Sequence, residues 1–263
     1  MVIDIFKMFG ASFTLNLLLM LGLWIIYLVR RNAGILDMAW GIGFILAAWS
    51  YFFLGRGDFF KMLIMTLMVT LWAGRLTRHL YLRYRKSEGE GSRYQYIRQQ
   101  WKAHSENLFF LMLFIFQGVL IVILSLPFFL VGFGSHSQWS MWEGWGILLW
   151  AVGVIGESFA DSQLTSFLED PENRGRVCRK GLWRFSRHPN YFFEVIVWIG
   201  FCLFAIPSNA GWLAIFSPLI MLGLLLKITG IPLTEADAIG SKGEQYRDYQ
   251  RTTSLFIPWF PKK

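Results

Sequence analysis

The chain has 263 residues, of which 55% are hydrophobic and only 16% are charged. Soluble domains carry about 25% charged residues, so this composition excludes an ordinary water-soluble protein. The formal net charge is +8 and there are two cysteines, too few for a disulfide scaffold. Membrane topology and attraction to lipid headgroups account for the positive charge, so we expect no nucleic-acid partner.

Apolar stretches of about 20 residues fit the hydrocarbon core of a bilayer. In chain order they cover about 8–29, 35–54, 59–82, 108–131, 144–168, 190–207 and 210–231. Because helices satisfy their own backbone groups in lipid, we predict an all-α integral membrane protein with seven transmembrane helices. We expect one membrane-embedded domain over 1–263, in which 1–134 mainly faces substrate and 144–263 mainly binds a cofactor.

The basic residues predict the orientation. Only Lys7, Arg56 and Lys61 fall on the side that includes the N-terminus, and the other basic residues fall on the opposite side. Positive charge is retained in the cytoplasm, so we expect the N-terminus outside and the C-terminus inside. A bacterial inner membrane is the expected location, with the cofactor site on its cytoplasmic side.

The loop after the third predicted span carries Glu88, Glu90, Arg93 and Tyr94. Two interpretations stay open for it. One is a solvated run of charges, and the other is a phosphate clamp in which Arg93 binds the cofactor.

Glu157 and Asp161 lie four residues apart in the fifth predicted span, on one helical face. Two carboxylates in a membrane helix require a partner, and the arginines between 174 and 187 are available. The pair either anchors that loop or faces a ligand. Ser162 and Gln163 extend the polar patch and favour the ligand.

The segment 181–194 concentrates polar side chains at the start of the sixth predicted span. Pro189 can open a helix, and the free N–H groups there, beside Arg187 and His188, suit a phosphate. Asn190 and Glu194 again share one helical face. The arginines can bind phosphates, and the carboxylates can accept hydrogen bonds from hydroxyl groups. Together they predict a nucleotide cofactor.

The C-terminal tail carries Tyr246 and Tyr249, three residues apart, followed by Arg251. Its final aromatic residues would lie at the membrane interface. The tail is either an interfacial amphipathic helix or a lid over the cofactor pocket.

These positions together resemble the C-terminal half of the steroid 5α-reductase family. The resemblance covers roughly 150–263 and is carried by Glu157, Asp161, Gly181-Leu182, Asn190, Glu194 and the tail ending in Ile257-Pro258. It implies an NADPH-dependent oxidoreductase that reduces the conjugated C=C of a 3-oxo-Δ4 steroid or similar lipophilic enone. The predicted cofactor-binding residues are Arg75, Arg93, Glu157, Asp161, Arg176, Arg187, His188, Asn190, Tyr191, Glu194, Tyr246 and Tyr249.

The first half departs from that family, which has a Gln-Glu pair in an early helix and a tyrosine in the next. Asp37 is the only acid in the second predicted span, and Trp72 stands three residues before Arg75, where the family has tyrosine. We predict Asp37 and Trp72 as the catalytic pair, with Asp37 holding the proton. An N-cap role for Asp37 is the alternative.

Two rival functions remain. The run 187–191, Arg-His-Pro-Asn-Tyr, also resembles membrane methyltransferases of the isoprenylcysteine carboxyl type, which use S-adenosylmethionine. Those enzymes carry adjacent glutamates before their final helix, where this chain has Glu235-Ala236-Asp237. A carrier or lipid-binding protein is the third possibility, although the paired halves of transporters are not visible. The four histidines are scattered, so we expect no metal.

Overall fold

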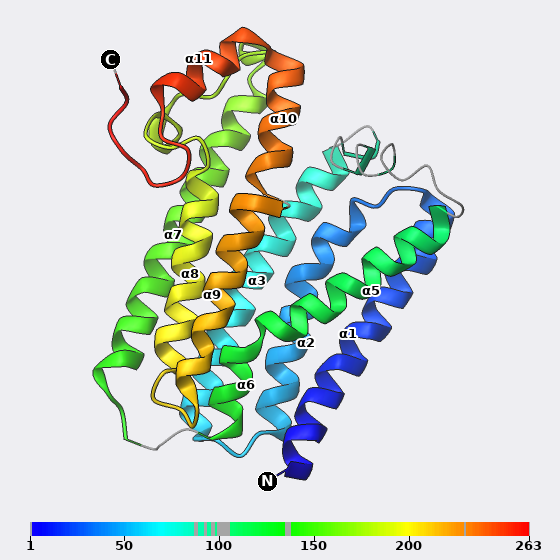
Figure 1. Cartoon of the computed structure of the whole chain (residues 1–263), viewed down its shortest axis with the longest axis vertical. Helices are drawn as coiled ribbons and strands as arrows, with labels where there is room; N and C mark the ends of the chain where they lie inside the picture. Colours follow the sequence, from blue (N-terminus) through cyan, green and yellow to red (C-terminus); the bar gives the residue numbers. More distant parts are fainter. Residues whose placement is uncertain are drawn as a thin grey trace. The chain divides into compact units, whose positions relative to one another are not determined.

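The computed structural model describes residues 2–86, 89–91, 94–95, 98, 106–134, 138–228 and 230–262. Within these ranges the regular elements are helices, and the only β-type pairing is an isolated bridge between Ser186 and Ser254. The α-helices of Figure 1 are α1 (Val2–Arg30), α2 (Ile35–Leu54), α3 (Phe59–Lys86), α5 (Glu106–Leu124), α6 (Leu126–Phe133), α7 (Met141–Glu169), α8 (Pro189–Ala205), α9 (Phe216–Gly223), α10 (Ile231–Lys242) and α11 (Glu244–Thr252). The prediction of an all-α chain is confirmed for the described residues.

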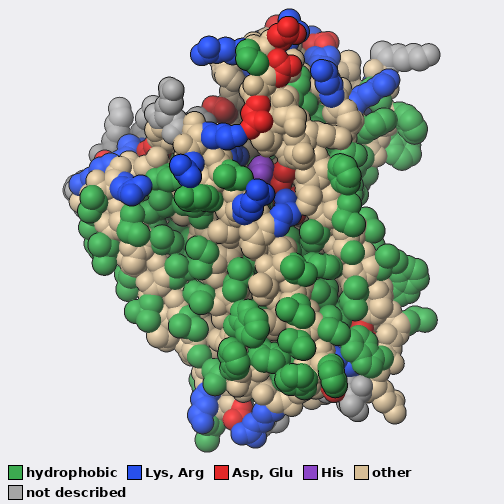
Figure 2. Space-filling model, turned by 180° about the vertical axis from the view of Figure 1, so that it is seen from behind, with side chains coloured by type: hydrophobic (Ala, Val, Ile, Leu, Met, Phe, Trp, Pro, Cys, Tyr) green, Lys and Arg blue, Asp and Glu red, His purple; other side chains and the backbone are tan. Residues whose placement is uncertain are grey.

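Five segments in the described part are long and apolar enough to cross a membrane. They are Ile3–Arg30, Ile35–Leu54, Phe59–Lys86, Glu106–Leu124 and Gly211–Lys242. Figure 2 shows a face on which exposed hydrophobic side chains gather in large numbers. Such a surface is favourable only against lipid or another apolar partner, which supports an integral membrane protein.

The fifth and sixth predicted spans are helices but do not meet the same criterion. α7 is 29 residues long and carries Glu157 and Asp161, whereas α8 is apolar and only 17 residues long. Seven spans, and their orientation, therefore stay a prediction.

The fourth predicted span, 108–131, is not one continuous helix. α5 ends at Leu124, and α6 begins at Leu126 with Pro127 in its first turn. Proline has no N–H to donate and disfavours the helical conformation of the preceding residue, so a break is expected there. The Ser125 hydroxyl at the break donates to the carbonyl of Val122 at 2.8 Å and lies 3.0 Å from the Tyr51 hydroxyl.

The chain divides into two compact units. The first comprises Met1–Gly144 and Phe201–Ser217, and the second comprises Trp145–Gly200 and Pro218–Lys263. Helices α7, α8 and α9 each contribute residues to both units.

Aromatic side chains fill the core of the first unit. Trp72 is fully buried, and its ring centroid lies 5.5 Å from that of Phe44 and 5.6 Å from that of Phe201. Phe128 packs edge-on against Phe201 at 5.0 Å. The two pairs that involve Phe201 are edge-to-face, a geometry that stabilises the core beyond the area that the rings bury.

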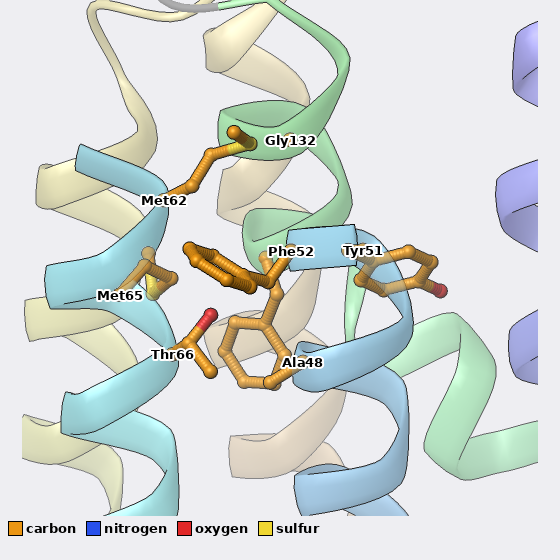
Figure 3. A pocket seen from close by; sticks show the side chains of 8 residues that line it. Ala48, Tyr51, Phe52, Met62, Met65, Thr66 and Gly132 are labelled. Carbon is orange, nitrogen blue, oxygen red and sulfur yellow. The ribbon is translucent and has the colours of Figure 1, made fainter. Parts of the chain in front are cut away.

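A small cavity lies between α2, α3 and α6 in this unit. Figure 3 shows Met62, Met65 and Thr66 of α3 facing Phe52 of α2, whereas the Tyr51 ring points away. Its volume is about 10 Å³. That is about the space of one water molecule, so this cavity is too small for a steroid.

A buried ion pair connects the start of α7 to α3. Lys61 Nζ lies 2.5 Å from Glu143 Oε1, and each side chain is 1% exposed. Lys61 also donates to the carbonyl of Gln138 at 2.7 Å, and the amide of Ser140 donates to Glu143 Oε2 at 2.9 Å. These hydrogen bonds offset the cost of burying both charges.

Glycines allow α7 and α8 to pack closely in the second unit. A Cβ at Gly156 would meet the Phe193 ring at 2.3 Å, and one at Gly153 would meet the backbone N of Val197 at 2.7 Å. Small residues at such positions let membrane helices approach each other, and dispersion then stabilises the pair. The polar residues of α7 and α8 are therefore held on adjoining helices.

Candidate functional site

Charged side chains are buried together in the second unit. Glu157 and Asp161 of α7 are 4% and 7% exposed, Arg187 and His188 before α8 are 9% and 5%, and Glu194 of α8 is 8%. Buried charges are costly unless they are paired or hold a ligand. The partners of each group therefore indicate what the site can do.

Glu235 of α10 is the partner of Arg187. The guanidinium donates from Nε to Glu235 Oε1 at 2.7 Å and from Nη2 to Oε2 at 3.3 Å. Its Nη1 donates to the carbonyl oxygens of Gln250 and Thr253, both at 2.9 Å. Arg187 is thus occupied largely by the chain itself, and its binding of a cofactor phosphate stays a prediction.

Three more side chains converge on Glu235. His188 Nε2 lies 3.3 Å from Oε1, Gln250 Nε2 donates to Oε2 at 2.8 Å, and the Tyr246 hydroxyl donates to Oε1 at 3.3 Å. We call Arg187, His188, Glu235, Tyr246 and Gln250 the Glu235 cluster. It joins the start of α8 to α10 and α11.

The rings of His188 and Tyr191 are stacked, with centroids 5.4 Å apart and planes 5° from parallel. The backbone N–H of His188 donates to the Ser186 hydroxyl at 3.1 Å. Pro189 then begins α8, as the sequence predicted. These contacts fix the imidazole beside the first turn of α8.

A second group of polar side chains lies between α7 and α8. Asn190 Nδ2 donates to Asp161 Oδ1 at 3.4 Å, while the buried Asn190 Oδ1 finds no hydrogen-bond partner among the described residues. Glu194 accepts from the indole N–H of Trp198 at 2.8 Å. The structure thus brings Asp161 and Asn190 together and leaves an amide oxygen that can accept from a ligand.

The C-terminal tail is bound to the segment before α8. The Tyr249 hydroxyl donates to the carbonyls of Trp183 and of Ser186, and the Arg187 N–H donates to the carbonyl of Ser254 at 2.9 Å. Burial raises the pKa of Tyr246 and of Tyr249, so both phenols are protonated donors at neutral pH. The tail therefore positions the residues around Arg187.

Arg176 lies apart from the Glu235 cluster, on the rim of an open pocket of about 490 Å³. The pocket is also lined by Phe167, Val177, Arg179, Lys180 and Asp248. Arg176 is exposed, and its contact with a cofactor stays a prediction.

Asp37, Trp72 and Arg75 belong to the first unit. Asp37 accepts a hydrogen bond from the Tyr94 hydroxyl at 2.6 Å. The N-cap of α2 is Gly34, so the structure does not give Asp37 the alternative role of N-cap. Sequence reasoning missed the pairing with Tyr94, since nothing local in the sequence links a loop tyrosine to this acid.

Arg93, together with Glu88, lies outside the described residues, so its predicted role as a phosphate clamp is not tested. Glu90 of the same loop is described. It accepts from Arg98 Nη2 at 2.9 Å and from the Ala33 amide at 2.9 Å, so this acid belongs to a local ion-pair network.

Known proteins resemble the chain over different lengths. An uncharacterized protein of Schizosaccharomyces pombe is 28% identical over 265 residues, covering 90% of this chain and 75% of that protein. Methanethiol S-methyltransferase 1 of Bradyrhizobium diazoefficiens is 30% identical over 120 residues, which is 44% of this chain and 39% of that enzyme. No solved structure matches the chain significantly.

A family model matches residues 23–253, nearly the whole chain and both compact units. Its description is "Protein of unknown function (DUF1295)". The match includes the end of α1 and all the helices from α2 to α11. The chain therefore belongs to the DUF1295 family.

Proposed function

We propose that the chain is a membrane methyltransferase that transfers the methyl group of S-adenosylmethionine to a thiol of a small lipophilic acceptor. The observation that carries this proposal is the junction between Arg187-His188 and Glu235. The run 187–191 resembles methyltransferases of the isoprenylcysteine carboxyl type, and Glu235-Ala236-Asp237 stands where those enzymes carry adjacent glutamates. The similarity to a methanethiol S-methyltransferase supports both the reaction and the thiol acceptor.

The polar residues of the second unit fit this cofactor chemically. S-adenosylmethionine would supply an activated methyl group on a positively charged sulfonium. Buried carboxylates at Asp161 and Glu194 favour a cation in a poorly solvated site. The amide oxygen of Asn190 can accept a hydrogen bond from a ribose hydroxyl or an ammonium group.

The Glu235 cluster would position this chemistry. Arg187 and Glu235 fix the first turn of α8, and Asn190 and Glu194 follow in that helix. In the overall reaction the thiol loses its proton and gains the methyl group, giving a thioether, S-adenosylhomocysteine and a proton.

Binding and turnover test the proposal directly. The purified protein in detergent is titrated with S-adenosylmethionine and with NADPH, and then incubated with methyl-labelled S-adenosylmethionine and methanethiol. We expect tighter binding of S-adenosylmethionine and appearance of the label in a thioether. Tighter binding of NADPH, or no label transfer to any thiol offered, would contradict it.

An NADPH-dependent reductase is the second candidate, and one observation favours it. Asp161 and Asn190 are in contact, and these are two of the positions on which the steroid 5α-reductase resemblance depends. In this case the carboxylate and amide would hold ribose hydroxyls of the dinucleotide. Incubation with NADPH and a 3-oxo-Δ4 steroid, followed by mass analysis, tests it, because only a reductase adds two hydrogens to the steroid.

A further inference from the structure

The pocket on whose rim Arg176 lies is separate from the Glu235 cluster. It has a volume of about 490 Å³ and lies between the end of α7, the loop before the Gly181–Arg184 turn, and α11. None of the residues that line it belongs to the Glu235 cluster. The site proposed for methyl transfer therefore does not account for this pocket.

Positive charge dominates the pocket. It is lined by three cations, Arg176, Arg179 and Lys180, and by one carboxylate, Asp248. Asp248 is already paired with Arg179, at 2.9 Å. Within the described part of the chain, no carboxylate lies within ion-pair distance of Arg176 or Lys180. Two cations thus remain for a ligand, and phosphate oxygens are well matched to them.

Arg179 is held in place for such a ligand. Besides pairing with Asp248, its Nη2 donates to the carbonyl of Gln245 at 3.0 Å. Its guanidinium also lies over the Tyr249 ring, 5.3 Å from the centroid. A guanidinium fixed from two sides loses little conformational entropy when it contacts a ligand.

Exposed apolar side chains of α7 lead toward the pocket. Leu148, Val152, Ile155 and Phe159 share one helical face, and each is 46–60% exposed. Leu168, next to Phe167 of the pocket wall, is 64% exposed on the opposite side of the helix. From Leu148 to Leu168 the helix rises about 30 Å, the thickness of a hydrocarbon core. If α7 crosses the bilayer over this length, as the sequence predicts, the pocket lies at the level of the lipid headgroups.

We propose that this pocket binds the phosphate of an anionic phospholipid headgroup, with Arg176 and Lys180 as the principal ligands. Basic pockets at the cytoplasmic ends of membrane helices bind such headgroups. Phe167 and Val177 supply an apolar wall for the glycerol end of the lipid. This binding site goes beyond the proposed methyl transfer and does not depend on it.

Retention of lipid by the purified chain tests the proposal. The full chain is placed in bilayer nanodiscs of phosphatidylcholine and phosphatidylglycerol, extracted, and analysed by native mass spectrometry for lipid that stays bound. We expect selective retention of phosphatidylglycerol by the wild type. The double variant Arg176→Gln, Lys180→Gln should bind it about thirtyfold more weakly, which corresponds to about 2 kcal/mol. Both residues are exposed, so the variant should fold normally.

Arg184→Gln is the matched control, because Arg184 is an exposed arginine in the same segment that does not line the pocket. It should retain phosphatidylglycerol like the wild type. Equal retention of both lipids, or the same loss in Arg184→Gln, would overturn the proposal. Displacement of phosphatidylglycerol from the wild type by inorganic phosphate or NADPH would also overturn it, by assigning the pocket to a soluble phosphate. Lipid retention is measured without turnover, so its failure is distinguishable from failure of methyl transfer.

Discussion

At the scale of single residues, Glu235 accepts hydrogen bonds from the side chains of Arg187, Gln250 and Tyr246 and lies beside His188. Removing the charge of one partner of a buried ion pair leaves the other charge uncompensated, which costs more than the pair itself contributes. This residue therefore couples the stability of the second unit to the geometry of the candidate site.

We predict that Glu235→Gln lowers the free energy of unfolding by about 3 kcal/mol and reduces methyl transfer at least tenfold. The neutral amide leaves Arg187 without its counter-charge. Thermal unfolding in detergent and a labelled-methyl assay measure the two effects. Asp237→Asn is the control, because Asp237 lies on the same helix and is exposed. If Glu235→Gln behaved like this control, the Glu235 cluster would have no part in the function.

A substitution of Asp161 distinguishes a ligand-binding role of this carboxylate from a structural role. We predict that Asp161→Asn weakens S-adenosylmethionine binding about tenfold while the protein still folds, since one charge-assisted interaction contributes about 1.5–3 kcal/mol. Calorimetric titration gives the affinity, and a melting curve reports the fold. Asp170→Asn, an exposed acid just beyond the same helix, should leave affinity unchanged. Unchanged affinity for Asp161→Asn would indicate that the acid pair only anchors neighbouring elements.

At the scale of elements, close packing of α7 against α8 holds the polar residues of the two helices on adjoining helices. We predict that Gly156→Ala destabilises the protein by about 1–3 kcal/mol, because the new Cβ would lie 2.3 Å from the Phe193 ring. Gly144→Ala, on the same helix, meets no atom within 4 Å and should be neutral or stabilising. Comparison of the two melting temperatures in one detergent checks this, and equal values would mean that the helices are not closely packed at Gly156.

The tail and the segment before α8 act as one element. We predict that Tyr249→Phe lowers the free energy of unfolding by about 1–3 kcal/mol, because it leaves two buried carbonyls, of Trp183 and Ser186, without a donor. Limited proteolysis of the C-terminal segment should become faster in this variant. Tyr81→Phe, at an exposed position of α3, provides the comparison. Equal proteolysis rates would show that the tail is held by other contacts.

At the scale of the whole molecule, acid pH should act on the Lys61–Glu143 pair. Burial raises the pKa of Glu143, but hydrogen bonds from Lys61 and Ser140 outweigh it and hold the pKa below the ordinary 4.5. A lowered folded-state pKa contributes stability that is present above pH 4.5 and is lost as the pH falls through the folded value. The melting temperature of the wild type should therefore decrease below pH 4.5.

Glu143→Gln should abolish part of this acid dependence and lower the stability at neutral pH by about 3 kcal/mol, because Lys61 stays buried. Glu172→Gln, an exposed acid, is the control. The melting temperatures of the wild type and of both variants, measured over a series of pH values, test this prediction. If the melting temperature of Glu143→Gln decreased below pH 4.5 as steeply as that of the wild type, other carboxylates would be responsible for the loss of stability.

The sequence by itself determined the helical membrane class, the acid pair of α7 and the helix that begins at Pro189. Each of these depends on residues within one or two helical turns, where hydropathy, spacing and proline geometry act directly. The break at Ser125 was missed, because 108–131 was predicted as one span although Pro127 carries the signal for a break. Substrate and cofactor stay predictions because they depend on chemistry that no local pattern specifies.

Only the tertiary structure decided the partners of the buried charges. Arg187 and Glu235 are 48 residues apart, and Tyr94 and Asp37 are 57 apart, so nothing in the local sequence pairs them. Every buried charge needs a partner, but which partner it finds is set by how distant helices pack. The sequence therefore named most of the polar residues of the candidate site, and the fold decided which of them bind one another and which remain available to a ligand.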